Sequence, residues 1–254
     1  NLKSTFLLSV AFLLTIGCKP EDQQEIKQKA ATLTEFCATV ADMELKSIVM
    51  PETGKFCWEK GDQIIVDNGS DVAIFTYNSS RGVFVTERDD FALAESYTAV
   101  FPASAYVEGS DAGSPKVAVA AEQTVYPDYV KDLTMVAKAG KDAEFVFQNL
   151  FSVVRIEFPA DKLTSSNEGD IVKVDFTSES AAVAGIASVS DGTLAFENGA
   201  VKTISFDCSQ KDINVEAPLF VAIPAQTYIG GFVFDFTFAD NSTFTLSCKE
   251  DLTA

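Results

Sequence analysis

The sequence predicts an all-β protein. Apolar and polar residues alternate with a period of two in many short runs, and Phe232, Phe234, Phe236 and Phe238 give the clearest example. A period of two places these rings on one face of a strand, whereas a helix would scatter them over several faces. The runs recur about every ten residues, with Gly, Asn, Asp and Ser between them, which is typical of β-sandwiches.

The individual strands follow from the same alternation. Val154 and Ile156 alternate with Arg155, and Val172 and Val174 alternate with Lys173, so both runs have one apolar and one polar face. The expected strands, in chain order, are 64–66, 72–77, 83–85, 97–101, 116–119, 133–138, 144–147, 154–158, 172–177, 194–196, 203–206, 219–223, 232–238 and 244–248.

A polar run divides the chain into two expected sandwiches. Residues 162–170 contain two serines, an Asn and a Gly, and they lie between Pro159 and a fresh alternating strand. Each half also has a strand that ends in a similar Pro-Ala sequence, at residues 100–103 and 222–225. Phe158, Pro159 and Ala160 share this ending, so the repeat can equally mark a strand that stops for want of an amide donor. The expected organisation is a first sandwich at 32–160, a linker at 161–170 and a second sandwich at 171–254.

The first 17 residues have the features of an export signal. Lys3 gives a positive start, and the apolar run from Thr5 to Ile16 is too short to span a bilayer. The segment from Leu14 to Cys18 resembles the bacterial lipobox, in which the Cys is acylated and becomes the first mature residue. The expectation is a lipoprotein signal peptide at 1–17 and a lipid on Cys18; the alternative is an ordinary secretory signal that contains a Cys.

A polar tether follows the expected lipidation site. Residues 18–31 have low hydrophobicity and no periodic apolar face. Lys19, Glu21 and Asp22 resemble the short acidic signal that exports outer-membrane lipoproteins to the cell surface. A charged linker without sorting value is the alternative.

Composition excludes several classes of function. The net charge of −18 argues against nucleic acid as a partner and against electrostatic binding to anionic membranes. The chain contains no histidine, so sites that depend on this residue, such as a Ser/His/Asp triad, cannot form. Paired carboxylates could support glycoside hydrolysis, but no catalytic motif distinguishes one pair among 37 acidic residues. We therefore expect neither an enzyme nor a cofactor.

The remaining cysteines have no metal-binding or redox spacing. Cys37, Cys57, Cys208 and Cys248 include no CxxC pair. If disulfides form, pairing within each expected sandwich favours Cys37 with Cys57 and Cys208 with Cys248. Buried free thiols are the alternative.

Four other features have residue types that suit a binding site, and each also has a purely structural interpretation. Trp58 can stack on a ligand, but its place before a Gly-Asp pair at a strand start favours a core role. The oxygen-rich segments 67–71 and 240–242 favour turns between strands over calcium sites, because neither has the spacing of a calcium loop. The charged cluster 87–90 favours a solvated loop over a cation or sugar site.

The order of several segments resembles the fimbrillin-like proteins related to type V pili. Phe56 to Ile64 is similar to the family's segment of an aromatic residue, Trp, a variable pair, Gly, Asp and an aliphatic residue. Further similar segments follow in family order, and together with the lipobox they cover nearly the whole chain. They are Tyr97 to Ala103, Glu122 to Thr124, Asp132 to Ala137 and Phe145 to Ile156.

The resemblance implies two tandem transthyretin-like, immunoglobulin-like β-sandwiches in an outer-membrane lipoprotein exposed at the cell surface. It also implies a role as a pilus subunit or a related adhesin, with other pilus subunits or surface proteins bound by β-strand addition and a host protein or glycan as receptor. In polymerising members, a protease cuts after a basic residue and removes an N-terminal strand. Here the first Arg after Cys18 is Arg81, and Lys27, Lys29 and Lys46 are the basic residues placed where a cut could fall. An anchored accessory or tip-like protein is therefore expected rather than a stalk subunit.

The sequence also leaves one alternative function open and gives an expectation for its last residues. A surface glycan-binding sandwich is the alternative, although it needs exposed aromatic residues and most of the Phe residues occupy core-like positions. The segment from Leu252 to Ala254 resembles the point at which family members continue into a final strand. If the natural chain continues in the same way, residues 171–254 lack this strand and leave an edge that accepts another chain.

Overall fold

Strands make up almost all of the regular structure, as the alternation predicts. The computed structural model describes residues 32–40, 58–110, 113–127, 129–131, 133–141, 144–158, 169–209 and 213–253. Within these ranges the only helix is one 3-10 turn, η1 (Ala103–Ala105), so no described helix is long and apolar enough to cross a membrane. The predicted all-β class is confirmed.

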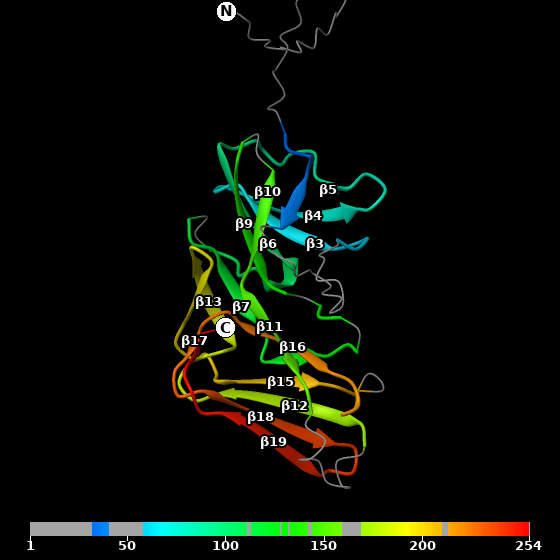
Figure 1. The fold of residues 1–254 in the computed structure, drawn as a ribbon. Helices are drawn as coiled ribbons and strands as arrows, with labels where there is room; N and C mark the ends of the chain where they lie inside the picture. The colour runs from blue at the N-terminus through cyan, green and yellow to red at the C-terminus, as the bar shows by residue number, and fades with distance from the viewer. Residues whose placement is uncertain are drawn as a thin grey trace, which may run out of the picture. The chain divides into compact units, whose positions relative to one another are not determined.

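Eight strands form the first sheet (Figure 1). In spatial order they are β1 (Glu35–Phe36), β5 (Val83–Val85), β4 (Val72–Asn78), β3 (Gln63–Asp67), β6 (Ser96–Phe101), β9 (Met135–Gly140), β10 (Phe145–Asn149) and β2 (Ala38–Val40). Alternate residues point inward, so Ala73 and Phe75 are buried while Ile74 between them is 50% exposed. The inward side chains form a first core that is rich in aromatic rings.

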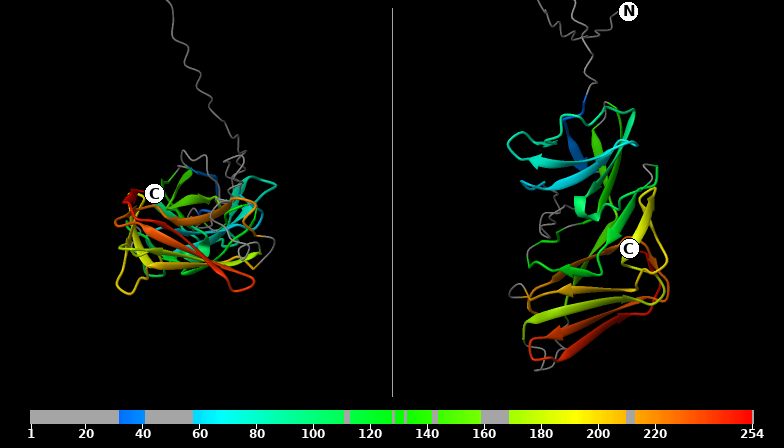
Figure 2. Two further views of the ribbon diagram at one scale, coloured as in Figure 1. Left: turned by 60° about the horizontal axis from the view of Figure 1, so that its bottom comes forward. Right: turned by 180° about the vertical axis from the view of Figure 1, so that it is seen from behind.

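The other strands form four smaller sheets around a second core (Figure 2). The largest contains, in order, β19 (Thr243–Cys248), β18 (Phe232–Phe238), β12 (Ile171–Ser178), β15 (Thr203–Asp207) and β8 (Glu122–Thr124). The others are β14 (Thr193–Phe196) with β13 (Gly185–Ser190) and β7 (Lys116–Val119), β11 (Phe151–Ile156) with β16 (Leu219–Pro224), and β17 (Thr227–Tyr228) with β20 (Leu252–Thr253).

The second core lies between facing sheets. Phe176 and Phe236 reach it from the five-stranded sheet, whereas Ala187 comes from β13 and Val221 from β16. Two layers that bury alternate side chains against each other make a β-sandwich. On β18, Phe234, Phe236 and Phe238 are buried while Asp235 is exposed, so the predicted period of two is confirmed there.

Strand pairing does not follow the predicted division at 161–170. β7, β8 and β11 precede this segment in the chain, yet they pair with β13, β15 and β16, which follow it. β6 is shared between the cores, because Ala99 points into the first and Val100 into the second. Alternation along one strand reveals its buried face but not its partner, which explains the difference. Residues 159–168 themselves lie outside the described residues.

Candidate functional site

One six-residue segment pairs with strands at both edges of the first sheet. We call residues 35–40, which comprise β1, Cys37 and β2, the closing segment. Its first half is antiparallel to β5, with Phe36 opposite Phe84. Its second half is parallel to β10, with Thr39 opposite Val146. β1 and β2 lie at opposite edges of the sheet, and only Cys37 separates them in the chain. The closing segment therefore joins the two edges and closes the sheet.

The closing segment also fills the open side of the first core. Phe36, Ala38 and Val40 pack against that core, while Glu35, Cys37 and Thr39 are exposed. The ring centroid of Phe36 lies 4.9 Å from that of Phe75, 5.9 Å from that of Phe84 and 4.5 Å from that of Phe145. Phe36 is thus an aromatic anchor surrounded by rings from three different strands.

Backbone hydrogen bonds hold the chain on both sides of Phe36. The amide of Leu33 donates to the carbonyl of Phe91 over 2.9 Å, and the amide of Phe145 donates to the carbonyl of Cys37 over 3.2 Å. An ion pair between Glu35 and Arg81 lies on the exposed side, where such pairs contribute little to stability. The closing segment is thus held by short stretches of pairing on each side.

Trp58 belongs to the packing under the closing segment, as its position in the sequence favours. Its ring makes edge contacts with Phe84 at 4.8 Å, Phe101 at 5.2 Å and Phe147 at 5.5 Å between centroids. Its indole N–H donates to the carbonyl of Ala38 over 3.0 Å. This polar contact explains why a Trp serves here, since it packs in the core and also holds the neighbouring strand.

A surface depression lies beside the closing segment. It has a volume of about 410 Å³ and is lined by Phe36 and Cys37 on one side and by Tyr97, Lys141 and Phe145 on the other. Cys37 and Lys141 are exposed, so the depression opens to solvent next to the segment.

The closing segment is not among the strands predicted from the sequence. The inward positions 36, 38 and 40 alternate with 35, 37 and 39, so a period-two signal was present. It covers only a few residues, and Cys and Ala are weak markers of a strand face. Its role at two edges depends on strands far away in the chain, which no local pattern reveals.

The oxygen-rich segments are turns, as predicted. Residues 67–71 join β3 to β4, and the Asn68 side-chain oxygen accepts from the amides of Ser70 at 2.9 Å and Asp71 at 2.7 Å. Residues 240–242 join β18 to β19, with Asn241 at a positive φ of 66°. Among the described residues, no group of three or more acidic or Cys side chains could hold a metal ion.

The charged cluster 87–90 is held by ion pairs within the chain. Arg88 donates to Asp71 over 2.7 Å and to Asp90 over 2.8 Å, and its guanidinium lies 5.8 Å from the ring centre of Phe91. Hydrogen bonds from Arg88 lower the pKa of both carboxyl groups. Arg88 therefore fixes the loop to the start of β4 and has its donors already engaged.

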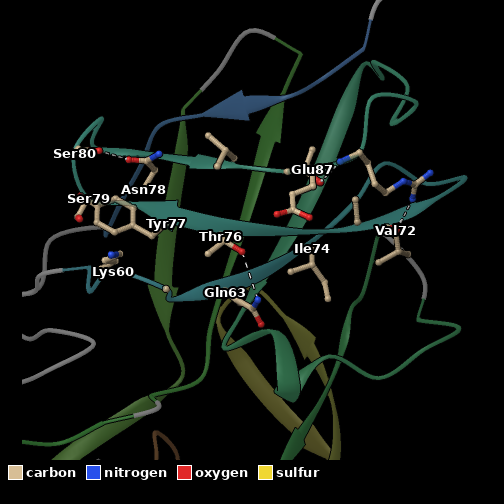
Figure 3. A pocket seen from close by; sticks show the side chains of 15 residues that line it. Lys60, Gln63, Val72, Ile74, Thr76, Tyr77, Asn78, Ser79, Ser80 and Glu87 are labelled. Carbon is tan, nitrogen blue, oxygen red and sulfur yellow. Dashed lines mark hydrogen bonds between the residues drawn. The ribbon is translucent and has the colours of Figure 1, made fainter.

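A second depression lies on the outer face of β4 (Figure 3). It has a volume of about 940 Å³, and Figure 3 shows Gln63, Ile74, Thr76 and Glu87 along it. Gln63 donates to the hydroxyl of Thr76 over 3.4 Å, a long and weak contact. The depression is an open sheet face on which polar side chains surround the exposed Ile74.

Cys208 and Cys248 do not pair: both carry free thiols, which is the alternative that the sequence left open. The amide of Cys208 bonds to Val172 at one end of β12, whereas Cys248 lies opposite Phe232, which pairs with Ser178 at the other end. Six residues along a strand span about 20 Å, and a disulfide requires Cα atoms closer than about 7 Å. Cys37 is also a free, exposed thiol. Its expected partner Cys57 lies outside the described residues, as do Cys18, Lys19, Glu21 and Asp22.

The strands near the expected edge are paired or buried. Leu252 and Thr253 form β20, which pairs with β17. Within the described ranges, β16 pairs with β11 on one side and with no strand on the other. Its residues are nevertheless almost all buried, so this edge is not an open apolar groove.

Comparisons with known proteins give distant structural likenesses. The chain matches no protein-family model, and no curated protein matches it significantly. Two crystal structures of proteins named for cell adhesion are similar to it. The one from Bacteroides ovatus has 14% identity and a TM-score of 0.48, and covers 75% of this chain and 77% of its own. The one from Bacteroides uniformis has 16% identity and a TM-score of 0.48, and covers 74% and 78%. Identities and scores this low carry no argument about the role of this chain.

Proposed function

We propose that this protein is a cell-surface lipoprotein of the fimbrillin type, anchored in the outer membrane through Cys18. It acts as an accessory, tip or anchor subunit of a pilus, or as a related adhesin, and it assembles with other subunits by strand addition. Its role is to bind rather than to catalyse. The ordered segments from Phe56 to Ile156 that resemble the family support this proposal.

The closing segment is the observation that carries the proposal. It is short, it pairs with both edges of one sheet, and it places a single large side chain, Phe36, in an aromatic core. Removing it would expose unpaired backbone groups along β5 and β10 together with an apolar groove. A strand from another subunit can satisfy the same backbone groups, as in other cases of strand addition.

Lys46 lies between the closing segment and Trp58. A cut after Lys46 would leave the segment bound by non-covalent contacts alone, whereas a cut after Lys27 or Lys29 would leave it attached. Release of the segment by cleavage therefore requires a cut after Lys46.

The test uses a site for a sequence-specific protease inserted after Lys46. After cutting, a fluorescent peptide with the sequence of residues 32–40 should exchange with the resident segment, seen as a rise in fluorescence anisotropy. The uncut protein is the control and should take up little peptide. A peptide that carries Phe36→Ala should bind at least about tenfold more weakly, because it lacks the aromatic anchor.

The proposal of strand addition at this site fails if the cut protein keeps its segment and excludes the peptide. It also fails if the Phe36→Ala peptide binds as well as the natural one, because the groove would then not recognise the anchor.

A further inference from the structure

A separate pocket lies where β7, β8, η1 and the start of β11 meet. Its volume is about 460 Å³, within the range of roughly 300 to 1,000 Å³ that is usual for small-molecule sites. Phe151 and Val119 give it an apolar part, and Ser104, Thr124 and Thr134 contribute hydroxyl groups. The closing segment does not line it.

Thr134 presents a hydroxyl group to this pocket. The residue is only 4% exposed, and its side chain has no hydrogen-bond partner within the described part of the chain. Every fully enclosed side-chain oxygen or nitrogen among the described residues does have a partner. The Thr134 hydroxyl therefore borders the open space of the pocket, where a ligand hydroxyl can satisfy it.

Tyr126 provides a flat aromatic wall with a rigid backing. Its ring is stacked on that of Tyr129, with 4.6 Å between centroids and 13° between planes. Both residues are half-buried, and Tyr126 lines the pocket. The face of an aromatic ring carries partial negative charge and attracts the slightly positive C–H groups on the flat side of a sugar ring.

The charge of the lining indicates a neutral ligand. Among the described residues that line the pocket, Glu122 and Lys131 are the charged ones, and they carry opposite charges. The Gln123 amide donates to the carbonyl of Ala120 over 3.2 Å, which holds the side chain and leaves its oxygen as an acceptor. In a chain of net charge −18, an anionic ligand would also meet general repulsion.

We propose that this pocket binds a neutral pyranose unit of a surface glycan, stacked on Tyr126 and hydrogen-bonded by Thr134 and its neighbours. Paired hydroxyl donors and acceptors beside one aromatic face match the chemistry of a sugar ring. The proposal is independent of strand addition and gives the protein a receptor class of its own.

Saturation-transfer NMR on the purified protein tests this with methyl α-D-galactopyranoside, methyl α-D-mannopyranoside and N-acetyl-D-glucosamine. At least one of these neutral sugars should receive transfer from the protein. N-acetylneuraminic acid, which is anionic, should receive little. Tyr126→Ala should weaken binding by at least about tenfold, and Tyr126→Phe should retain it because the ring face remains. Thr134→Val keeps the side-chain shape and should weaken binding about two- to tenfold through the lost hydrogen bond.

The matched control is Thr76→Val, which removes a hydroxyl from the separate depression on β4 and should leave sugar binding unchanged. Circular dichroism checks that each variant is folded. The proposal is overturned if no neutral sugar of the panel binds, if Tyr126→Ala binds like the wild type, or if the anionic sugar binds more tightly than the neutral ones.

Discussion

Burial sets the chemistry of the Cys208 thiol. The side chain is 2% exposed within the second core, and burial raises its pKa to about 12. The thiolate is the reactive form, so at pH 8 only about one thiol in ten thousand is reactive at any moment.

Iodoacetamide at pH 8 should therefore alkylate Cys37 in the folded protein and leave Cys208 unmodified. After unfolding in guanidinium chloride, Cys208 should react as well. Mass spectrometry of the digested protein reads both sites. Rapid labelling of Cys208 in the folded state would contradict its place in the second core.

Two glycines separate the cost of backbone conformation from the cost of a clash. Gly231 has a φ of +85°, and a Cβ atom there would lie 1.9 Å from the carbonyl oxygen of Cys248. Gly69 has a φ of +83° in the turn between β3 and β4, with no atom within 4 Å of a Cβ. Gly231 is required both by its positive φ and by the clash that a Cβ atom would cause, whereas Gly69 is required by its positive φ alone.

Gly231→Ala should thus lower the free energy of unfolding by at least about 3 kcal/mol, because β18 and β19 must move apart. Gly69→Ala should cost about 1 to 2 kcal/mol, the strain of a left-handed alanine. Urea unfolding followed by fluorescence gives both values. Equal losses for the two variants would mean that the contact between Gly231 and Cys248 is not as described.

At the scale of elements, the closing segment concentrates its apolar contact in one side chain. Phe36 packs on rings from β4, β5 and β10, whereas Thr39 in the same segment is exposed. Phe36→Ala should lower the free energy of unfolding by about 2 to 4 kcal/mol, since the ring is half-buried.

Thr39→Ala is the matched control and should change stability by less than about 0.5 kcal/mol. Denaturant unfolding measures both variants. A Phe36→Ala protein as stable as the wild type would show that the segment contributes little to the first core.

Local pattern predicted the strands whose alternation is strong, such as β12 and β18, and it predicted the turns at 67–71 and 240–242. It missed β1, β2, β8, β17 and β20, which are only two or three residues long, and it also missed the six-residue β13. Such short strands depend on partners already in place rather than on their own sequence. The pocket at Tyr126 was missed for a similar reason, because it joins residues from four separate elements.

At the scale of the whole molecule, the sequence predicts the correct fold class, while strand pairing crosses the division expected at 161–170. β6 and β9 contribute residues to both cores, with Ala137 in the first and Val136 in the second. Residues from 31 onward form one compact unit by their contacts. Strands that precede the polar run 161–170 thus pair with strands that follow it. Pairing between such distant parts of the chain has no local signature in the sequence.

Membrane attachment gives a prediction at the same scale. Cys18→Ala should abolish incorporation of labelled fatty acid in cells, because the acylated thiol is removed. The protein should then move from the membrane to the soluble fraction. Cys37→Ser is the control and should leave both labelling and attachment unchanged. Unaltered membrane attachment of Cys18→Ala would rule out the proposed anchor.

The central claim is that another strand replaces the closing segment, and a reversible lock tests it most directly. Thr39 and Val146 are opposite each other on β2 and β10, and Val146 is 48% exposed. Neighbouring strands lie about 4.8 Å apart, so cysteines at both positions can form a disulfide. Cys37→Ser removes the nearest competing thiol.

The measurement is the uptake of the fluorescent peptide of residues 32–40, by anisotropy, in this locked variant after cutting at the site inserted behind Lys46. The oxidised form should take up little peptide, because the lock retains the segment. Reduction should free the segment, open the groove to the peptide and raise the anisotropy. Equal anisotropy before and after reduction, with the segment released in the reduced sample, would contradict strand addition at this groove.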